Sequence, residues 1–274
     1  MEPIVFSVED LDGLAAFYAK EGYVLLRGLY SEAQLEAMEN DCVRAQSEVV
    51  AGRLPERYGS VAFLDDERKA ERFANYVEYV NELSPAVLEA VTDTRLIAAL
   101  ERLLGPDCWL NDGHRFGVVY QDARPGRESG YSRIGWHADW QAAPNLDIWP
   151  SAAFTIHIDA TSPANGFLRV VPGSHRWATP APGNVPLPEG SRSHGGHTDD
   201  PAPFPMPLGF EKVPGETAVY CERGDLLLHD AYLWHAAARA SDDDTTRRHI
   251  RGGYFTGDKE GDGSKEVFVK NAAR

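Results

Sequence analysis

The first hundred residues show the hydrophobic spacing of helices, interrupted by one short apolar run. Leu11, Leu14 and Tyr18 recur at the three-to-four-residue intervals of an amphipathic helix. Ser7 precedes this pattern and acidic residues follow it, so we expect Ser7 to cap the helix. The run YVLLRG, within 22–28, is typical of a short buried strand.

Two further helix signals follow before the pattern changes. The capping box SEAQ at 31–34 predicts a helix that runs to about Val50. A second apolar period over 92–104 predicts a helix that ends at Gly105, which a proline follows. Residues 1–106 are therefore expected to form a largely helical support.

From about residue 108 the chain consists of short apolar runs separated by Gly, Pro, Asn and Asp. Such runs predict β-strands, and Asn165-Gly166 is a strong turn signal between two of them. The runs are FGVVYQ, AAFTIHIDA, GFLRVVPGSH, ETAVYCERGDLLLH and RRHIRGGYF. Many short strands after a helical segment predict an α+β, mainly β fold: a double-stranded β-helix, the jelly roll of cupin-like proteins, buttressed by N-terminal helices.

We expect one domain over residues 1–274, with the jelly-roll core over 107–274. Residues 178–215 lack strand periodicity and are rich in Pro, Gly, Ser and His. A structureless connection of this length is usually functional or mobile. A lid over the site is one interpretation, and a merely tolerated insertion is the other.

The formal net charge is −15, which narrows the possible partners. Nucleic acids and anionic membrane surfaces both require a cationic protein surface, so we expect neither as a partner. A small anionic ligand is compatible with local arginines, and Arg124, Arg127 and Arg133 precede the motif GWHADW. The expected partner is a small-molecule substrate, and the sequence makes no prediction of the oligomeric state.

The cysteines and the N-terminal sequence indicate the compartment. Cys42, Cys108 and Cys221 are odd in number and lack the spacing of a disulfide framework, which favours a reducing environment. The N-terminal residues have no basic region leading into a long apolar run, as a signal peptide would. No apolar run approaches the ~20 residues of a membrane span. We therefore expect a cytoplasmic protein.

The pattern His-x-Asp occurs three times, and each copy is a candidate half of a metal site. On a strand, residues i and i+2 face the same side, so the pair delivers an imidazole and a carboxylate to one point. A distant second histidine completes the facial triad that holds iron(II) and leaves positions open. The pairs at 137/139 and 157/159 both fit this geometry, although 157/159 also fits polar residues satisfied by neighbours. The pair at 197/199 lies among glycines and prolines, which favours a solvated loop.

Longer segments provide the context that this short pattern lacks. GWHADW, NGFLRVVPGSH, GDLLLHDAYLWHAAA and RRHIRGGYF together resemble the phytanoyl-CoA dioxygenase-like family. FYAKEGYVLLRGLYSEAQLEAM is similar to that family's opening helix–strand–helix. The resemblance covers nearly the whole chain and is weakest at 50–80 and 178–215. Members of the family are Fe(II)- and 2-oxoglutarate-dependent oxygenases that use O2.

The resemblance implies a specific set of site residues. In the family, the NG-to-PGSH segment follows the metal-binding His-x-Asp, which here identifies His137 and Asp139. His235 is then implied as the third iron ligand. Arg247, twelve residues further on, is implied to bind the distal carboxylate of 2-oxoglutarate through its planar fork of donors.

Other residues remain as alternatives or additions. Arg251 shares a strand face with Arg247 and is the reserve choice for the carboxylate, while His229 competes with His235 for the metal. Thr155 lies near a position that contacts the co-substrate in the family, although strand propensity explains a threonine there equally well. Trp140 is a candidate substrate-binding residue, and a packed core aromatic is its alternative.

The resemblance also implies the reaction. 2-Oxoglutarate is decarboxylated to succinate and CO2 while an unactivated C–H of a small molecule, such as a secondary metabolite or a lipid-like acid, is hydroxylated. Halogenating members carry Ala or Gly in place of Asp139, so the carboxylate here favours oxygenation. The alternatives are another metal-dependent cupin-type enzyme, an isomerase or hydrolase that would not need Arg247, and a non-catalytic jelly-roll binding module.

Overall fold

The computed structural model describes residues 4–59, 64–66, 71–113, 117–123, 134–242 and 244–257. The three arginines that precede GWHADW, at positions 124, 127 and 133, lie outside these residues. Among the described helices, none is long and apolar enough to cross a membrane.

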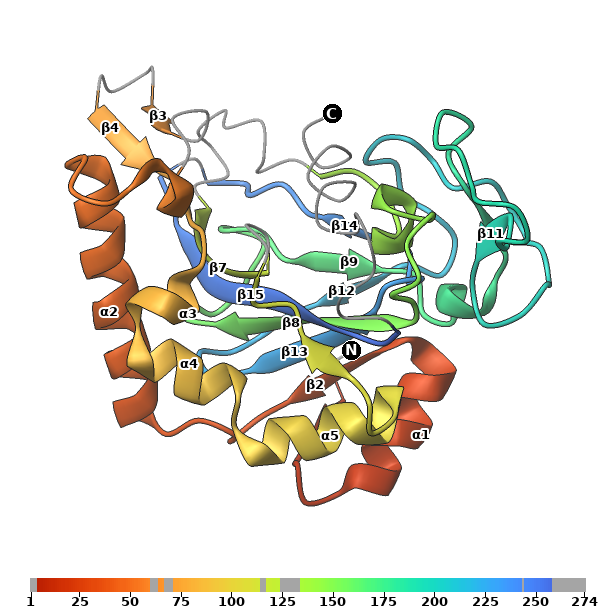
Figure 1. The fold of residues 1–274 in the computed structure, drawn as a ribbon, viewed down its shortest axis with the longest axis horizontal. Coiled ribbons are helices and arrows are strands. Elements are labelled where there is room, and N and C mark those ends of the chain that lie inside the picture. Colours follow the sequence, from red (N-terminus) through yellow and green to blue (C-terminus); the bar gives the residue numbers. More distant parts are fainter. Residues whose placement is uncertain are drawn as a thin grey trace.

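Figure 1 shows two sheets and a layer of helices, with the helices covering the outer face of the larger sheet. The helices are α1 (Leu11–Glu21), α2 (Glu32–Val50), α3 (Val80–Leu83), α4 (Pro85–Val91) and α5 (Thr94–Leu104), with 3-10 turns η1 (Glu56–Tyr58), η3 (Asp139–Ala142) and η4 (Ser174–Arg176). The strands are β1 (Val5–Phe6), β2 (Tyr23–Leu26), β3 (Leu64–Asp66), β4 (Glu71–Ala74), β5 (Tyr76–Val77), β6 (Trp109–Leu110), β7 (Val118–Ala123), β8 (Ser151–His157), β9 (Leu168–Val170), β10 (Thr179–Pro180), β11 (His194–Gly195), β12 (Thr217–Val219), β13 (Leu226–Asp230), β14 (His235–Ala237) and β15 (Arg247–Phe255).

The helix starts follow their local capping chemistry. In α2, the Ser31 side chain and Gln34 form the reciprocal capping box that the sequence predicts. In α1 the predicted cap is wrong. Asp10, not Ser7, caps the helix and accepts a hydrogen bond from the Gly13 amide at 2.9 Å. Ser7 instead accepts from the Glu9 amide at 3.2 Å and forms the turn before the helix.

The larger sheet has the order β1-β2-β13-β8-β15-β7-β5, with β6 also paired to β15. The smaller sheet has the order β12-β9-β14. The central pairs β13–β8, β8–β15 and β15–β7 are all antiparallel. Two facing, mainly antiparallel sheets with helices on one outer face confirm the predicted jelly-roll fold class, whereas the single-domain organisation stays a prediction.

Side-chain alternation along the central strands divides the interior in two. Phe154, Ile156 and Leu228 point toward the helices and are fully buried in the larger core, which α1, α2 and α5 cover. Leu227, between two such residues, faces the smaller sheet and packs with Val170 of β9. The neighbouring inward-facing positions of β8 and β15 carry the polar residues of the candidate site.

The segment 178–215 is not the structureless connection that its composition predicts. Its strands β10 and β11 pair antiparallel. The Trp177 ring, just before the segment, lies 5.3 Å from the Trp234 ring. The Phe204 ring lies 5.8 Å from the same Trp234 ring. We call residues 178–215 the insert. Buried aromatic contacts therefore dock the insert beside the strand that carries His235.

Candidate active site

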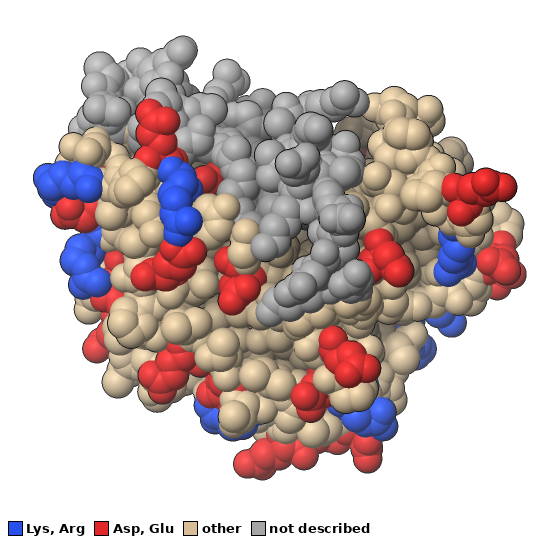
Figure 2. All heavy atoms as spheres, viewed as in Figure 1, with Lys and Arg blue, Asp and Glu red and all other residues tan. Residues whose placement is uncertain are grey.

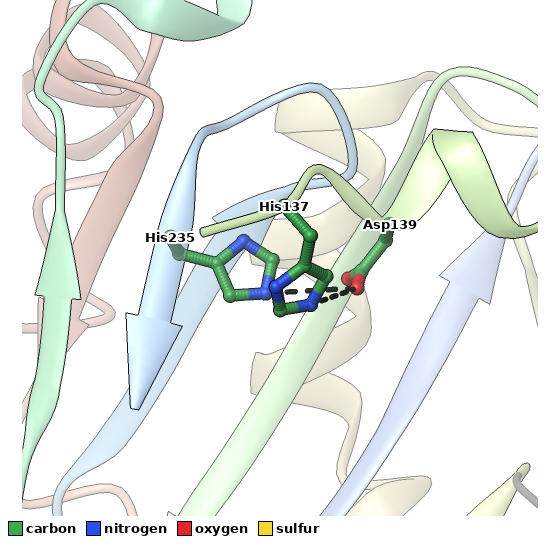
Figure 3. Close-up of side chains that lie close together, drawn as sticks. All are labelled: His137, Asp139 and His235. Carbon is green, nitrogen blue, oxygen red and sulfur yellow. Dashed lines mark ion pairs between the residues drawn. The ribbon is translucent and has the colours of Figure 1, made fainter. Parts of the chain in front are cut away.

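Three donor side chains converge where the smaller sheet meets the loop after β7. The donor atoms of His137, Asp139 and His235 all lie within 4.8 Å of one another (Figure 3). The Asp139 Oδ1 is 3.5 Å from the His137 Nε2 and 3.6 Å from the His235 Nε2. Donors on adjacent octahedral positions, each about 2.1 Å from a metal, lie about 3 Å apart. The arrangement therefore fits one metal ion after a small adjustment.

The backbone brings the three residues together. His137 and His235 exchange two backbone hydrogen bonds, of 3.0 Å and 2.9 Å, which add the 137 segment to the edge of β14. Asp139 does not lie on a strand, as the i, i+2 argument assumes, because it begins the 3-10 turn η3. Ala138 between the two residues is extended, so His137 and Asp139 still point to the same side.

Each of the two imidazole rings is oriented by a hydrogen bond from its Nδ1 to a backbone carbonyl. The His137 Nδ1 lies 2.8 Å from the Gly135 carbonyl, and the His235 Nδ1 lies 2.9 Å from the Leu233 carbonyl. A carbonyl accepts only, so Nδ1 carries a proton in both rings, and Nε2 is the nitrogen that faces the metal position. Metal-binding histidines are held in this way in proteins.

The charges match a metal-binding donor set. Burial alone would raise the pKa of Asp139, but the adjacent imidazoles of His235 and His137 outweigh burial and hold this pKa well below its ordinary value. Burial, together with the neighbouring His137 and His229, lowers the pKa of His235 well below its ordinary value. At neutral pH the site thus offers an ionised carboxylate and a neutral His235 imidazole, the forms that bind metals.

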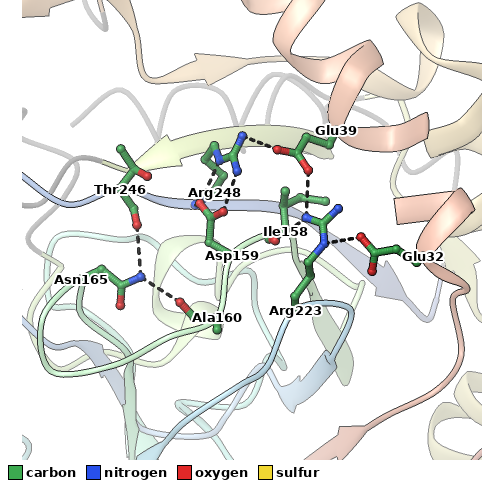
Figure 4. A network of polar contacts seen from close by, with 9 residues as sticks. All are labelled: Glu32, Glu39, Ile158, Asp159, Ala160, Asn165, Arg223, Thr246 and Arg248. Atoms are coloured by element: carbon green, nitrogen blue, oxygen red, sulfur yellow. Dashed lines mark hydrogen bonds and ion pairs between the residues drawn. The ribbon is translucent and has the colours of Figure 1, made fainter. Parts of the chain in front are cut away.

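The structure separates the two other His-x-Asp pairs. After β8, the Ile158 and Asp159 amides both donate to the Arg248 carbonyl, at 3.1 Å each, which is a β-bulge. Asp159 therefore turns toward the helices and contacts Arg248 at 2.7 Å, instead of sharing a face with His157 as predicted (Figure 4).

His197 and Asp199 also point to different places. The His197 Nε2 lies 2.8 Å from a carboxylate oxygen of Asp230, whereas the Asp199 side chain is 90% exposed. Among the described residues, His137, Asp139 and His235 form the one cluster with metal-binding spacing. His229 lies next to this cluster, with its ring 4.4 Å from the His235 ring, but outside the set of donors.

Arg247 begins β15 and points into the space between the sheets. Only 8% of the residue is exposed, and burial lowers the pKa of its guanidinium to about 10, so it is charged at neutral pH. Within the described ranges, no hydrogen bond or ion pair reaches its side chain. Arg248 faces the other way and pairs with Asp159 and Glu39, so adjacent arginines have opposite roles.

The remaining predicted residues lie as follows. Arg251 also faces inward, but it donates to the Gln121 Oε1 at 3.2 Å and stacks over the Tyr76 ring. Thr155 is the cross-strand partner of Arg251 on β8, on the inner face. Trp140 is buried and contacts Gly195 of the insert, where a Cβ would lie 2.4 Å from the indole. The roles of Thr155 and Trp140 stay predictions.

Arg247 is held by contacts that its local sequence does not reveal. The Asn165 side-chain amide donates to the Ala160 carbonyl at 2.8 Å and to the Thr246 carbonyl at 3.1 Å, and so ties the end of β8 to the start of β15 (Figure 4). Gly166 has φ +86°, and a Cβ there would lie 2.6 Å from the Arg247 Nη1. The Asn-Gly pair signalled only a turn; its contact with Arg247 depends on a strand 81 residues away.

The family model for phytanoyl-CoA dioxygenase (PhyH) matches residues 18–249. The ectoine dioxygenase of Nocardia farcinica is 28% identical over 194 residues, which are 68% of this chain and 58% of that enzyme. The ectoine dioxygenase of Sphingopyxis alaskensis is 25% identical over 179 residues, or 63% of this chain and 52% of that enzyme. The chain thus spans between one half and two thirds of the length of these relatives.

Solved structures share the fold at lower identity. EctD from S. alaskensis, solved with 2-oxoglutarate and 5-hydroxyectoine, superposes with a TM-score of 0.59 at 18% identity, covering 88% of this chain and 74% of that one. The carbocyclase SnoK from nogalamycin biosynthesis superposes with a TM-score of 0.61 at 19% identity, covering 94% and 92%. The family match covers most of the chain, and the shared fold agrees with it: this chain belongs to the phytanoyl-CoA dioxygenase family.

Proposed function

We propose that this chain is an Fe(II)- and 2-oxoglutarate-dependent oxygenase that hydroxylates an unactivated C–H of a small molecule. His137, Asp139 and His235 hold the iron, and Arg247 binds the distal carboxylate of 2-oxoglutarate. The family membership supports this assignment, as do the names of the relatives, which are dioxygenases. The donor spacing and the orientation of both imidazoles fit a metal on three adjacent positions.

The buried, unpaired guanidinium of Arg247 is the observation that favours a 2-oxoglutarate-dependent enzyme over other metal-dependent functions. A buried charge without a partner is costly, so proteins keep one where a ligand of opposite charge binds. A metal-dependent hydrolase or isomerase built on the same three ligands has no need of this group, and neither does a binding module without a metal. Arg247 is the better choice than Arg251, because Arg251 already contacts Gln121 and Tyr76.

The chain's own residues then have defined tasks. Iron bound at the triad supplies activation of O2, coupled to decarboxylation of 2-oxoglutarate to succinate and CO2. Asp139 provides the negative charge that favours a dication, and the Gly135 and Leu233 carbonyls fix the imidazoles that complete the site. Arg247 orients the co-substrate from the far end, which is catalysis by positioning. The aromatic layer formed by Trp136, Trp234 and the insert excludes water behind the ligands.

The substrate is proposed to be a small molecule without a large polyanionic group. Acidic and basic side chains are interspersed on the described part of the face in Figure 2, where no continuous basic patch appears. Together with the net charge of −15, this disfavours a CoA thioester, whose phosphates need basic contacts. Ectoine, named for the Nocardia enzyme, is the first compound to test.

We retain the cytoplasm as the proposed location, because all three cysteines are free thiols.

Anaerobic titration calorimetry tests the proposal by measuring Fe(II) binding first and 2-oxoglutarate binding to the iron-loaded protein second. Asp139→Ala is expected to weaken iron binding. Arg247→Leu is expected to leave iron binding unchanged and to weaken 2-oxoglutarate at least about tenfold, the loss of a hydrogen bond to a charged group. Equal loss of both ligands in Arg247→Leu would show that Arg247 supports the fold rather than the co-substrate.

A further inference from the structure

His157 is a buried imidazole with unused hydrogen-bonding capacity. Both of its ring nitrogens lack a hydrogen-bond partner among the described residues, and the residue is only 6% exposed. It ends β8 on the face that points away from the helical core, between Ile156 and Ile158, which point into that core. Buried polar atoms in folded proteins are nearly always hydrogen-bonded. A polar ligand at this position would give the His157 ring nitrogens a hydrogen-bond partner.

Arg247 points to the same region of the interior. His157 and His249 are cross-strand partners of β8 and β15, with ring centroids 6.1 Å apart. Arg247 precedes His249 by two residues and shares its strand face, so it is a diagonal neighbour of His157 within reach of a long side chain. Burial and then the charge of Arg247 lower the pKa of His157 to about 4, so the imidazole is neutral at neutral pH.

Of the polar side chains around His157, Gln121 and Asp225 are already engaged, whereas the His249 Nδ1 also lacks a hydrogen-bond partner among the described residues. The Gln121 Oε1 accepts from the His249 Nε2 at 3.0 Å. Asp225 binds the Arg27 guanidinium through both carboxylate oxygens, at 2.7 Å and 2.8 Å. Neither Gln121 nor Asp225 hydrogen-bonds to the His157 ring, so the neutral His157 imidazole and the unpaired Arg247 cation remain together on this inner face.

We propose that His157 donates a ring N–H to the carboxylate that Arg247 binds, and that the two residues together select the far end of the co-substrate. The inference rests on the proposed function, in which this carboxylate is the distal group of 2-oxoglutarate. A neutral imidazole suits the task, because it supplies a donor to the anion without repelling Arg247. The pocket then favours 2-oxo dicarboxylates over 2-oxo monocarboxylates of equal length.

The test compares 2-oxoglutarate with 2-oxopentanoate, which has the same number of carbons and a methyl group in place of the distal carboxylate. Their affinities for the anaerobic, iron-loaded protein are measured by calorimetry in the wild type, His157→Leu, His157→Gln and Arg247→Leu. His157→Leu is expected to weaken 2-oxoglutarate about tenfold and 2-oxopentanoate by less than about threefold. His157→Gln, which keeps an N–H donor, is expected to recover part of the loss.

His175→Leu is the matched control. His175 is also buried and also has an unpartnered Nδ1, but its Nε2 lies 3.1 Å from the Ala19 carbonyl of α1. His175→Leu is expected to lower the melting temperature without changing the ratio of the affinities for 2-oxoglutarate and 2-oxopentanoate. Equal weakening of both acids in His157→Leu, or no weakening of 2-oxoglutarate, would overturn the inference. The proposed function survives either result if Arg247→Leu still weakens 2-oxoglutarate selectively, and fails with the inference if the wild type does not bind 2-oxoglutarate.

Discussion

At the scale of single residues, the site depends on how each functional side chain is oriented. His137 and His235 are held by backbone carbonyls, and Asp139 follows an extended residue that keeps it on their side. Arg247 is placed by a different device, in which Asn165 fastens the start of β15 and Gly166 leaves room for the guanidinium. The two halves of the site are therefore positioned independently and can be perturbed separately.

Gly166→Ala tests the placement of Arg247. A Cβ at residue 166 would lie 2.6 Å from the Arg247 Nη1 and 2.7 Å from the Ala238 carbonyl oxygen, so the guanidinium must move. We expect on the order of tenfold weaker 2-oxoglutarate binding, the loss of one charged hydrogen bond, with iron binding unchanged, measured by calorimetry. Gly190→Ala is the control, because Gly190 has a similar φ of +84° and nothing within 4 Å of its Cβ position. Equal effects of the two substitutions would contradict the account.

Residue patterns in the sequence predicted part of this site. The proposed ligand set came from the resemblance, since motif order separated 137/139 from the two other pairs, and the structure brings its three side chains together. Strand alternation failed at Asp159, because a bulge opposite Arg248 reverses the pleat. A bulge depends on pairing with a distant strand, so local sequence does not reveal it. The contact between Gly166 and Arg247 is hidden for the same reason.

At the scale of elements, capping residues and apolar periods predicted α2 and α5 well, because these signals are local. The insert was predicted to be structureless because it lacks periodicity. Its order comes from contacts with the rest of the chain: Gly195 packs on the Trp140 indole, and His197 contacts the buried Asp230. A lid role for the insert stays a prediction.

The contact between His197 and Asp230 predicts that docking of the insert depends on pH. Burial would lower the pKa of His197, but the hydrogen bond to Asp230 outweighs burial and raises it. The stabilisation is therefore present below the ordinary histidine pKa of about 6.5 and is lost as pH rises through the raised pKa. Limited proteolysis within 178–215 is expected to be faster at about pH 8.5 than at about pH 6. His197→Gln is expected to remove this pH dependence, and a variant that keeps it would refute the assignment.

Gly195→Ala tests the other docking contact. The new Cβ would lie 2.4 Å from the Trp140 ring, so the insert must shift away from the core. We expect faster proteolysis of the insert and a change in tryptophan fluorescence. Gly183→Ala, in the same insert with nothing within 4 Å of its Cβ position, is expected to change neither. Indistinguishable behaviour of the two variants would show that this contact does not hold the insert.

In the molecule as a whole, the helices stabilise the fold from outside and the two sheets carry the candidate site between them. The helices bury the outer face of the larger sheet, and this leaves its inner face free to carry Arg247, His157 and Thr155. The sequence predicted this architecture because helical and strand periodicities occupy separate halves of the chain. It did not predict the strand order, since the pairing of β2 with β13 joins residues about two hundred positions apart. The family match and the shared fold agree with the architecture.

The central claim is that the chain couples O2 and 2-oxoglutarate at an iron held by His137, Asp139 and His235. The most direct measurement is succinate formed by the anaerobically purified protein after addition of Fe(II), 2-oxoglutarate and O2, with and without ectoine. We expect succinate above the protein-free control in the wild type, and none in Asp139→Ala. Succinate formation that persists in Asp139→Ala, or its absence from the iron-loaded wild type, would contradict the account.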